Sequence, residues 1–187
     1  MVFLNLSFLD LLSRLKQFSQ LKEWFTLEVL RRNFDSIGEG ATLVGRPIIM
    51  NAGRIEIASG FTLCSTPVPS HLATRPSGRL LVGRNVRIGS GASIFANELI
   101  EIGDDTTIGP MAMLLDIDFH QIKSRHSHGD ARPIRIGRHV RIGSGVVILR
   151  GAVIGDGAHI GANSVVARAV PAGVHAEGVP ARPVGVA

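Results

Sequence analysis

The chain has 187 residues, which is enough for one domain or for one domain with an appendage. Hydrophobic residues make up 45% and can fill a core, but only 5% are aromatic and 22 are glycine, which argues against a sandwich or bundle with wide gaps to fill. The net charge of +5 fits an anionic small molecule or a membrane surface, and arginines spread along the chain with few aromatic neighbours argue against nucleic acid. A single cysteine, Cys64, excludes an intrachain disulfide and a multi-cysteine metal site, and we expect it to be a small core residue.

Residues 1–34 differ from the rest of the chain and predict a helical segment. One helical face would carry Leu4, Phe8, Leu11, Leu15 and Phe18. This segment either caps the following domain or packs on a neighbouring subunit, because an uncovered sheet end leaves backbone groups unpaired. The alternative is an amphipathic helix on a membrane surface, through residues 1–30. No run reaches the ~18 apolar residues of a membrane span, and the opening MVFLNLSFLDLL lacks the positive start of a signal peptide.

Residues 35–187 carry a repeat of six residues. A weak start at Ile37, Leu43, Ile57 and Leu63 leads to a second run at Val82, Ile88, Ile94 and Ile100, which slips by two residues and resumes as Ile102, Ile108 and Leu114. A third run is strict: Ile136, Ile142, Ile148, Ile154, Ile160 and Val166. Four residues after each of these aliphatic residues stands a small or β-branched one: Val140, Val146, Ala152, Ala158, Ser164 and Val170.

A period of six fits neither a helix nor a simple strand, but it fits a short strand followed by a turn. Three such units predict a triangular coil of about 18 residues. Stacked coils would pair their backbones at the ~4.8 Å spacing of neighbouring strands. We therefore expect the aliphatic residue to point inward, the small residue to fit the corner, and glycine to ease the turn.

The repeat stops once, in a stretch of about residues 115–134 that contains Asp116, Asp118, His120, His126, His128 and Asp130. Long loops in compact domains are often functional. The histidines could alternatively hold a metal, since His126 and His128 follow His120, but a solvated polar loop explains them better, and we expect no metal.

The stretch from Pro133 to Val184, which contains the strict run, most closely resembles the hexapeptide-repeat acyltransferases, and the resemblance covers roughly residues 35–185. It implies an all-β fold, a left-handed parallel β-helix, whose hand is an exception to the usual rule and is not shown by the spacing. The spelling Asp116-Ile117-Asp118-Phe119-His120 before the restart Pro133-Ile134-Arg135-Ile136-Gly137 is similar to the sugar O-acetyltransferases of that family.

The resemblance implies that His120 is the general base for attack of a sugar hydroxyl on the thioester of acetyl-CoA. A carboxylate could orient its imidazole, and Asp118 and Asp116 are the candidates, although either could instead bind substrate or face water. The backbone N–H of Ser144 on an adjacent subunit would stabilise the oxyanion. These roles imply a homotrimer with sites between subunits and direct transfer without an acyl-enzyme.

Five positions match the family's acetyl-CoA contacts: Ser144, Ala162, Ala167, Arg168 and Arg182. Arg168 and Arg182 would pair with CoA phosphates, or simply face solvent. Asn97 matches an acceptor-binding asparagine, but a corner asparagine that bonds its own backbone is equally plausible. Two departures stand out. Arg141 replaces the usual tryptophan, which suggests an unusual or acidic acceptor, and Ala167 replaces a hydroxyl residue before the cation Arg168.

The sequence thus predicts an acetyl-CoA-dependent O-acetyltransferase that acts on a sugar or glycoconjugate, in the cytoplasm or on the cytoplasmic face of a membrane. The alternatives are an N-acetyltransferase of an amino sugar or small amine, and an inactive β-helical scaffold.

Overall fold

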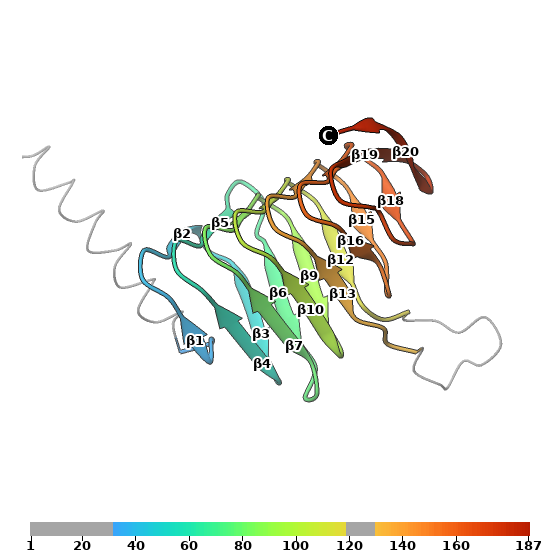
Figure 1. Ribbon diagram of the computed structural model, residues 1–187. Helices are drawn as coiled ribbons and strands as arrows, with labels where there is room; N and C mark the ends of the chain where they lie inside the picture. Colours follow the sequence, from blue (N-terminus) through green and yellow to red (C-terminus); the bar gives the residue numbers. More distant parts are fainter. Residues whose placement is uncertain (1–31, 119–129) are drawn as a thin grey trace, which may run out of the picture.

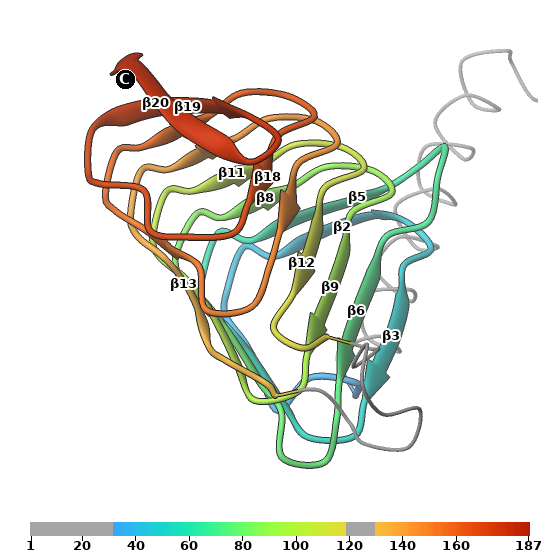
Figure 2. The same cartoon turned by 90° about the vertical axis from the view of Figure 1, so that its right-hand side faces the viewer.

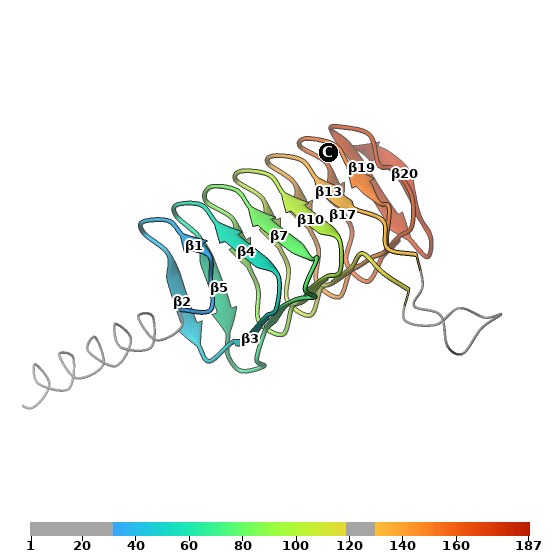
Figure 3. The same ribbon diagram turned by 90° about the horizontal axis from the view of Figure 1, so that it is seen from below.

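The computed structural model describes residues 32–118 and 130–187, which form a parallel β-solenoid (Figure 1). The chain winds in successive coils, and each coil adds one strand to each of three sheets in turn. Figure 2 shows the three-sided cross-section, and Figure 3 shows the coils stacked side by side. The described residues contain no helix, and so none that could cross a membrane. The predicted helical segment, residues 1–34, falls almost entirely outside them.

Each sheet collects one wall of the coils. Sheet A contains β1 (Ser36–Ile37), β4 (Arg54–Ile57), β7 (Arg79–Val82), β10 (Leu99–Ile102), β13 (Ile134–Ile136) and β16 (Val153–Ile154). Sheet B contains β2 (Thr42–Gly45), β5 (Thr62–Ser65), β8 (Arg87–Ile88), β11 (Thr107–Ile108), β14 (Arg141–Ile142), β17 (His159–Ile160), β19 (Val174–Gly178) and β20 (Ala181–Val186). Sheet C contains β3 (Ile48–Asn51), β6 (His71–Thr74), β9 (Ser93–Ala96), β12 (Met113–Leu115), β15 (Val147–Ile148) and β18 (Val165–Val166).

The length of a coil differs between the two halves of the solenoid. In the second half Arg141 pairs with His159, which follows it by three repeats, as the period of six predicts. In the first half the pairs are further apart in the sequence: Ser36 pairs with Glu56, and Thr62 pairs with Arg87. Strands of four residues occur in all three sheets of this half, and these longer walls depart from the period of six, which explains why the repeat is weak there in the sequence.

The core is a stack of aliphatic side chains along the solenoid axis. The inward residues predicted from the strict run, such as Ile136, Ile142 and Ile148, are buried, and so are the corner residues that follow them, such as Val140 and Val146. Corners leave little room, because a Cβ on Gly103 would lie 2.6 Å from the backbone carbonyl carbon of Gly137 on the next coil. Glycine is required at such a position since the obstructing atoms are backbone and cannot move aside.

The outer faces differ in chemistry. Sheet C presents apolar side chains, including the exposed Ile48, Met50 and Met113. Sheet A presents charges in pairs, as in Arg135–Glu101. Cys64 lies on the outer side of β5 and is only half-buried, so the expectation that it fills the core is wrong. The alternation along a four-residue strand puts Leu63 and Ser65 inside and turns Cys64 outward.

The last coil is covered by the chain itself. After β19 the chain turns back, and β20 pairs antiparallel with β19, the one antiparallel strand pair among the described strands. This hairpin lies at the C-terminal end of the solenoid (Figure 1). A hairpin of this kind ends the stack because the next strand runs in the wrong direction for another parallel coil.

Candidate active site

The break in the repeat lies at the corner between sheet C and sheet A. The chain leaves after β12 and returns at β13, and a bridge between Ile117 and Ala131 joins the two ends of the excursion. The N–H of Arg132 also donates a 2.8 Å hydrogen bond to the carbonyl of Asp116. His120, His126 and His128 lie outside the described residues. We call this place the loop corner: it comprises Asn97, Asp116–Asp118, Arg132, Arg150 and Arg168.

Asp116 is the most enclosed polar residue of the loop corner. Its side chain is fully buried, and its carboxylate accepts hydrogen bonds from the backbone N–H groups of Asn97, Glu98 and Leu99 at 2.7, 2.7 and 2.8 Å. Both oxygens are therefore occupied by the preceding coil. Such a carboxylate fixes the backbone where the wall turns, because three N–H groups that face inward would otherwise lack acceptors.

Asp118 occupies a more open position. Its Oδ2 lies 2.5 Å from Nε of Arg150, and its side chain is 43% exposed. No hydrogen bond from a described residue reaches its other oxygen, Oδ1. The sequence predicts that Asp116 or Asp118 orients His120. Of these two, only Asp118 has a carboxylate oxygen without a hydrogen-bond partner among the described residues.

Arg150 is a site residue that the sequence reasoning missed. It stands on the coil after the break, and the neighbouring Gly151 donates its N–H to the carbonyl of Arg132 at 3.0 Å. Its Nη1 is buried and has no hydrogen-bond partner among the described residues. The signal was present in the spacing, because Arg132, Arg150 and Arg168 follow one another at intervals of three repeats and so recur at one corner of successive coils.

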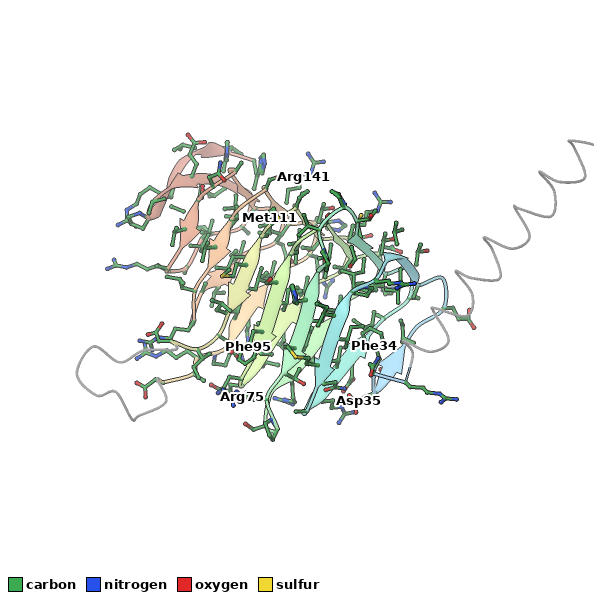
Figure 4. All side chains as sticks on the ribbon, turned by 180° about the vertical axis from the view of Figure 1, so that it is seen from behind. Phe34, Asp35, Arg75, Phe95, Met111 and Arg141 are labelled. Carbon is green, nitrogen blue, oxygen red and sulfur yellow. The ribbon has the colours of Figure 1, made fainter. Side chains whose placement is uncertain are left out.

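Asn97 lies beside Asp116, one coil before the break. Its backbone N–H is held by the Asp116 carboxylate, its carbonyl accepts a 3.3 Å hydrogen bond from Ser77 Oγ, and no hydrogen bond joins its side chain to another described residue. On the neighbouring outer face of sheet C, the Arg75 guanidinium lies 5.8 Å from the centre of the Phe95 ring. Figure 4 shows Arg75 and Phe95 toward the edge from which the loop leaves, and Arg141 toward the opposite edge.

The predicted cofactor residues fall into two groups. Ala167, Arg168 and Arg182 line one hollow of about 260 Å³ between the last coil and the C-terminal hairpin. Ser144 and Ala162 lie on successive coils at a different corner, between sheets B and C, where the N–H of Asn163 bonds the carbonyl of Ser144 at 2.8 Å. The N–H groups of Ser144 and Ala162 donate no hydrogen bond to the described residues, so both are available to a ligand.

Arg141 lies on a third surface, the outer face of sheet B. It pairs in register with Thr107 on one side and His159 on the other. Arg141 on β14 therefore lies on the wall opposite the corner between sheets C and A at which the repeat breaks. Among residues 32–118 and 130–187 no group of three His, Cys, Asp or Glu side chains could hold a metal ion.

Comparisons with known proteins agree with this architecture. Residues 133–168 match the family model described as bacterial transferase hexapeptide (six repeats). The comparison with curated proteins found no match. A solved structure of AntD, an N-acyltransferase from Bacillus cereus in complex with dTDP-4-amino-4,6-dideoxyglucose and coenzyme A, superposes with a TM-score of 0.71 over 85% of this chain and 87% of AntD, at 19% identity.

Two further solved structures share the fold. A hexapeptide-repeat-containing acetyltransferase from Vibrio cholerae is 25% identical, with a TM-score of 0.56, over 88% of this chain and 80% of its own. The polySia-specific acetyltransferase NeuO is 23% identical, with a TM-score of 0.52, over 82% and 80%. The resemblance inferred from the sequence is therefore confirmed: residues 133–168 carry the bacterial transferase hexapeptide repeat, the solenoid shares its fold with a hexapeptide-repeat acetyltransferase, and an acyltransferase is the enzyme class that these findings support.

Proposed function

We propose that the protein is an acetyl-CoA-dependent O-acetyltransferase that acetylates a hydroxyl of a sugar or glycoconjugate. The observation that carries the proposal is the long insertion between β12 and β13, which begins at a corner where Oδ1 of Asp118 has no hydrogen-bond partner among the described residues. The fold is shared with structures that contain coenzyme A or 3-hydroxybutyryl-CoA, which supports an acyl-CoA cosubstrate.

In this mechanism His120 removes the proton of the acceptor hydroxyl as its oxygen attacks the thioester carbonyl. The carbon–sulfur bond then breaks, and the proton passes from His120 to the leaving CoA thiolate, so no acyl-enzyme forms. Asp118 is better suited than Asp116 to orient the imidazole, because the Asp116 carboxylate is already bonded to three backbone N–H groups. General-base assistance of this kind contributes about 10²–10⁴-fold to the rate.

The free N–H of Ser144 would stabilise the oxyanion, and the N–H of Ala162 and the hollow with Ala167, Arg168 and Arg182 would hold acetyl-CoA. Ser144 and the loop corner lie at different corners of the solenoid, which supports a site formed between two copies of the chain. The apolar outer face of sheet C is a further reason to propose self-association, as the homotrimer of the family.

The left-handed sense of the coil, the helical segment over residues 1–34 and the cytoplasmic location also remain proposals, and they rest on the resemblance and the sequence. Peripheral membrane contact through residues 1–30 belongs to the same group.

A second candidate function is N-acylation of an amino sugar. It is favoured by the AntD superposition, which has a higher TM-score than that of NeuO, and AntD is an N-acyltransferase in complex with a 4-amino sugar nucleotide. An amine that is already neutral needs less help from a base than a hydroxyl does, so the two functions differ in how strongly they depend on His120.

The test measures release of free CoA from acetyl-CoA with sugars, amino sugars and nucleotide sugars as acceptors. His120→Ala should lower turnover with the preferred acceptor by at least about 100-fold. His139→Ala, at an exposed corner, is the control and should keep full turnover. If the wild-type chain releases no CoA with any acceptor, the protein is a scaffold; if only amines are acetylated, the second function replaces the first.

A further inference from the structure

One outer face of the solenoid carries a row of polar and cationic side chains, of which the sequence connects only Arg141 with the acceptor. In sheet B the outward residues align in register from coil to coil: Thr42, Thr62, Arg87, Thr107, Arg141, His159 and His175. We call this the sheet B row. It contains hydroxyls, guanidiniums and imidazoles, and no carboxylate. No other outer face of the described solenoid has this composition, since sheet C is apolar and sheet A alternates charges.

The arginines of the row have no acidic partner among the described residues, in contrast to two of the three outward arginines in the strands of sheet A, Arg79 being the exception. On sheet A, Arg54 pairs with Glu56 and Arg135 with Glu101. Arg87 and Arg141 form no ion pair with any described residue, and both are exposed. An exposed cation without a partner keeps its full attraction for an anion from solution, and two on one surface act together.

The acids nearest the row have partners of their own. Asp105 borders the row, accepts a 3.0 Å hydrogen bond from the Asn85 side chain and lies 3.8 Å from Nδ1 of His139. Glu177 faces His175, with 3.8 Å between Oε2 and Nε2. Each acid is therefore partly screened by its own neighbour, and the row keeps an excess of positive charge.

The row also offers a place for a ligand to sit. A polar hollow of about 290 Å³ is lined by Gly60, Thr62, Asn85, Arg87, Asp105 and Thr107. It combines a guanidinium with two threonine hydroxyls, an amide and the carboxylate of Asp105, whose Oδ1 already accepts the Asn85 amide. The guanidinium can bind a carboxylate or phosphate, and the hydroxyls and the carboxylate can bind neighbouring sugar hydroxyls. Further along the row, the rings of His159 and His175 stack with centroids 4.7 Å apart, and Nε2 of His175 is buried without a hydrogen-bond partner among the described residues.

Spacing favours a ligand with more than one negative group. Arg87 and Arg141 stand two coils apart, with Thr107 between them, which corresponds to about 10 Å at the strand spacing of a sheet. A single small anion reaches only one of them. An extended oligosaccharide with repeated carboxylates or phosphates reaches both.

We infer that the sheet B row is an acceptor-binding track and that the acceptor is an anionic glycan with repeated carboxylate or phosphate groups. The inference deepens the proposed function and rests on it for the word acceptor. Binding of the glycan does not depend on the proposed function, so it is measured without acetyl-CoA.

The probes are a galacturonate hexamer and its fully methyl-esterified form, which has the same length and no charge. The wild-type chain should bind the acid at least about tenfold more tightly than the ester at low salt, and the difference should vanish near 0.5 M NaCl, where charges are screened within a few ångströms. Arg87→Gln with Arg141→Gln should remove the preference, with each substitution weakening binding about three- to fivefold.

The matched control is Arg79→Gln, because Arg79 also begins an outward-facing strand, on sheet A, and the change in charge is the same. It should leave the preference intact. Arg87→Lys with Arg141→Lys keeps both charges and should retain most of the binding, which separates charge loss from misfolding. Equal binding of acid and ester by the wild type, or an equal loss in the Arg79 variant, would overturn the inference.

The phosphates of CoA are a second candidate anion for the same row. Therefore the apparent affinity for acetyl-CoA is measured in the Arg87 and Arg141 variants by equilibrium binding. It should stay within about twofold of the wild type. If the affinity for acetyl-CoA falls while that for galacturonate is unchanged, the row belongs to the cosubstrate and the inference is wrong. If the wild-type chain binds galacturonate as expected but releases no CoA with any acceptor, the result contradicts the proposed function and leaves the inference standing.

Discussion

The substitution Asp116→Asn tests whether this residue holds the structure or takes part in the chemistry. Asp116 lies at the start of the stretch that interrupts the repeat and belongs to the motif that resembles sugar O-acetyltransferases. The structure instead buries its carboxylate completely against the N–H groups of Asn97, Glu98 and Leu99. Asparagine has almost the same shape, so the change removes charge and one acceptor without leaving a cavity.

The magnitude follows from the three hydrogen bonds. A hydrogen bond to a charged group contributes about 1.5–3 kcal/mol and a neutral one about 0.5–1.5 kcal/mol. Asparagine keeps one oxygen, which can serve Glu98 and Leu99, while its NH₂ group then faces the N–H of Asn97. Loss of one bond and weakening of two lowers the free energy of unfolding by about 3–5 kcal/mol. For a chain of this size, that corresponds to a melting temperature lower by about 6–20 °C.

The assay is thermal unfolding followed by circular dichroism, with urea unfolding as a second measure. The control is Asp156→Asn, because Asp156 is exposed and accepts one backbone N–H, from Arg138 at 2.8 Å, which an asparagine oxygen can still accept. The control should change stability by less than about 1 kcal/mol. An Asp116→Asn protein that melts like the wild type but no longer releases CoA would refute the structural account and make Asp116 a catalytic residue.

Three other predictions concern stability. Ile100→Ala, at a fully buried core position, should lower the free energy of unfolding by about 2–5 kcal/mol in urea titrations, because no neighbour can fill the space. Gly103→Ala should reduce soluble folded yield, since its Cβ would meet backbone atoms, whereas Gly157→Ala, with φ of +68° and no atom within 4 Å, should fold with a loss of about 1–2 kcal/mol. Hydrogen bonds hold two carboxyl pKa values below their usual range: at Asp35 mainly the bond from the Asn51 side chain, and at Asp104 mainly the bond from Arg84. Their stabilising contribution is complete above the ordinary aspartate value and is lost as pH falls through the lowered values, so melting temperatures should drop in acid, and less steeply in an Asp35→Asn, Asp104→Asn variant.

The candidate site could be predicted only in part. The break in the repeat and the residues on either side of it were visible in the sequence, because a stacked coil cannot absorb an irregular segment inside a wall. The sequence did not show which of the two carboxylates, that of Asp116 or that of Asp118, is enclosed by the backbone. Which carboxylate is enclosed depends on where the preceding coil turns its N–H groups, and residues 97–99 are far from Asp116 along the chain. Arg150 could have been found from its spacing of three repeats to Arg132 and to Arg168.

The sequence by itself determined the architecture, because a period of six leaves only one way to bury an aliphatic residue in every strand. It also determined which residues face inward in the strict run from Ile136 to Val166. Only the tertiary structure decided the character of the outer faces. The unequal lengths of the coils set which side chains come into register, and so placed Arg87, Arg141 and His175 in one row although they are scattered in the sequence. Register is a property of neighbouring coils, and no local pattern contains it.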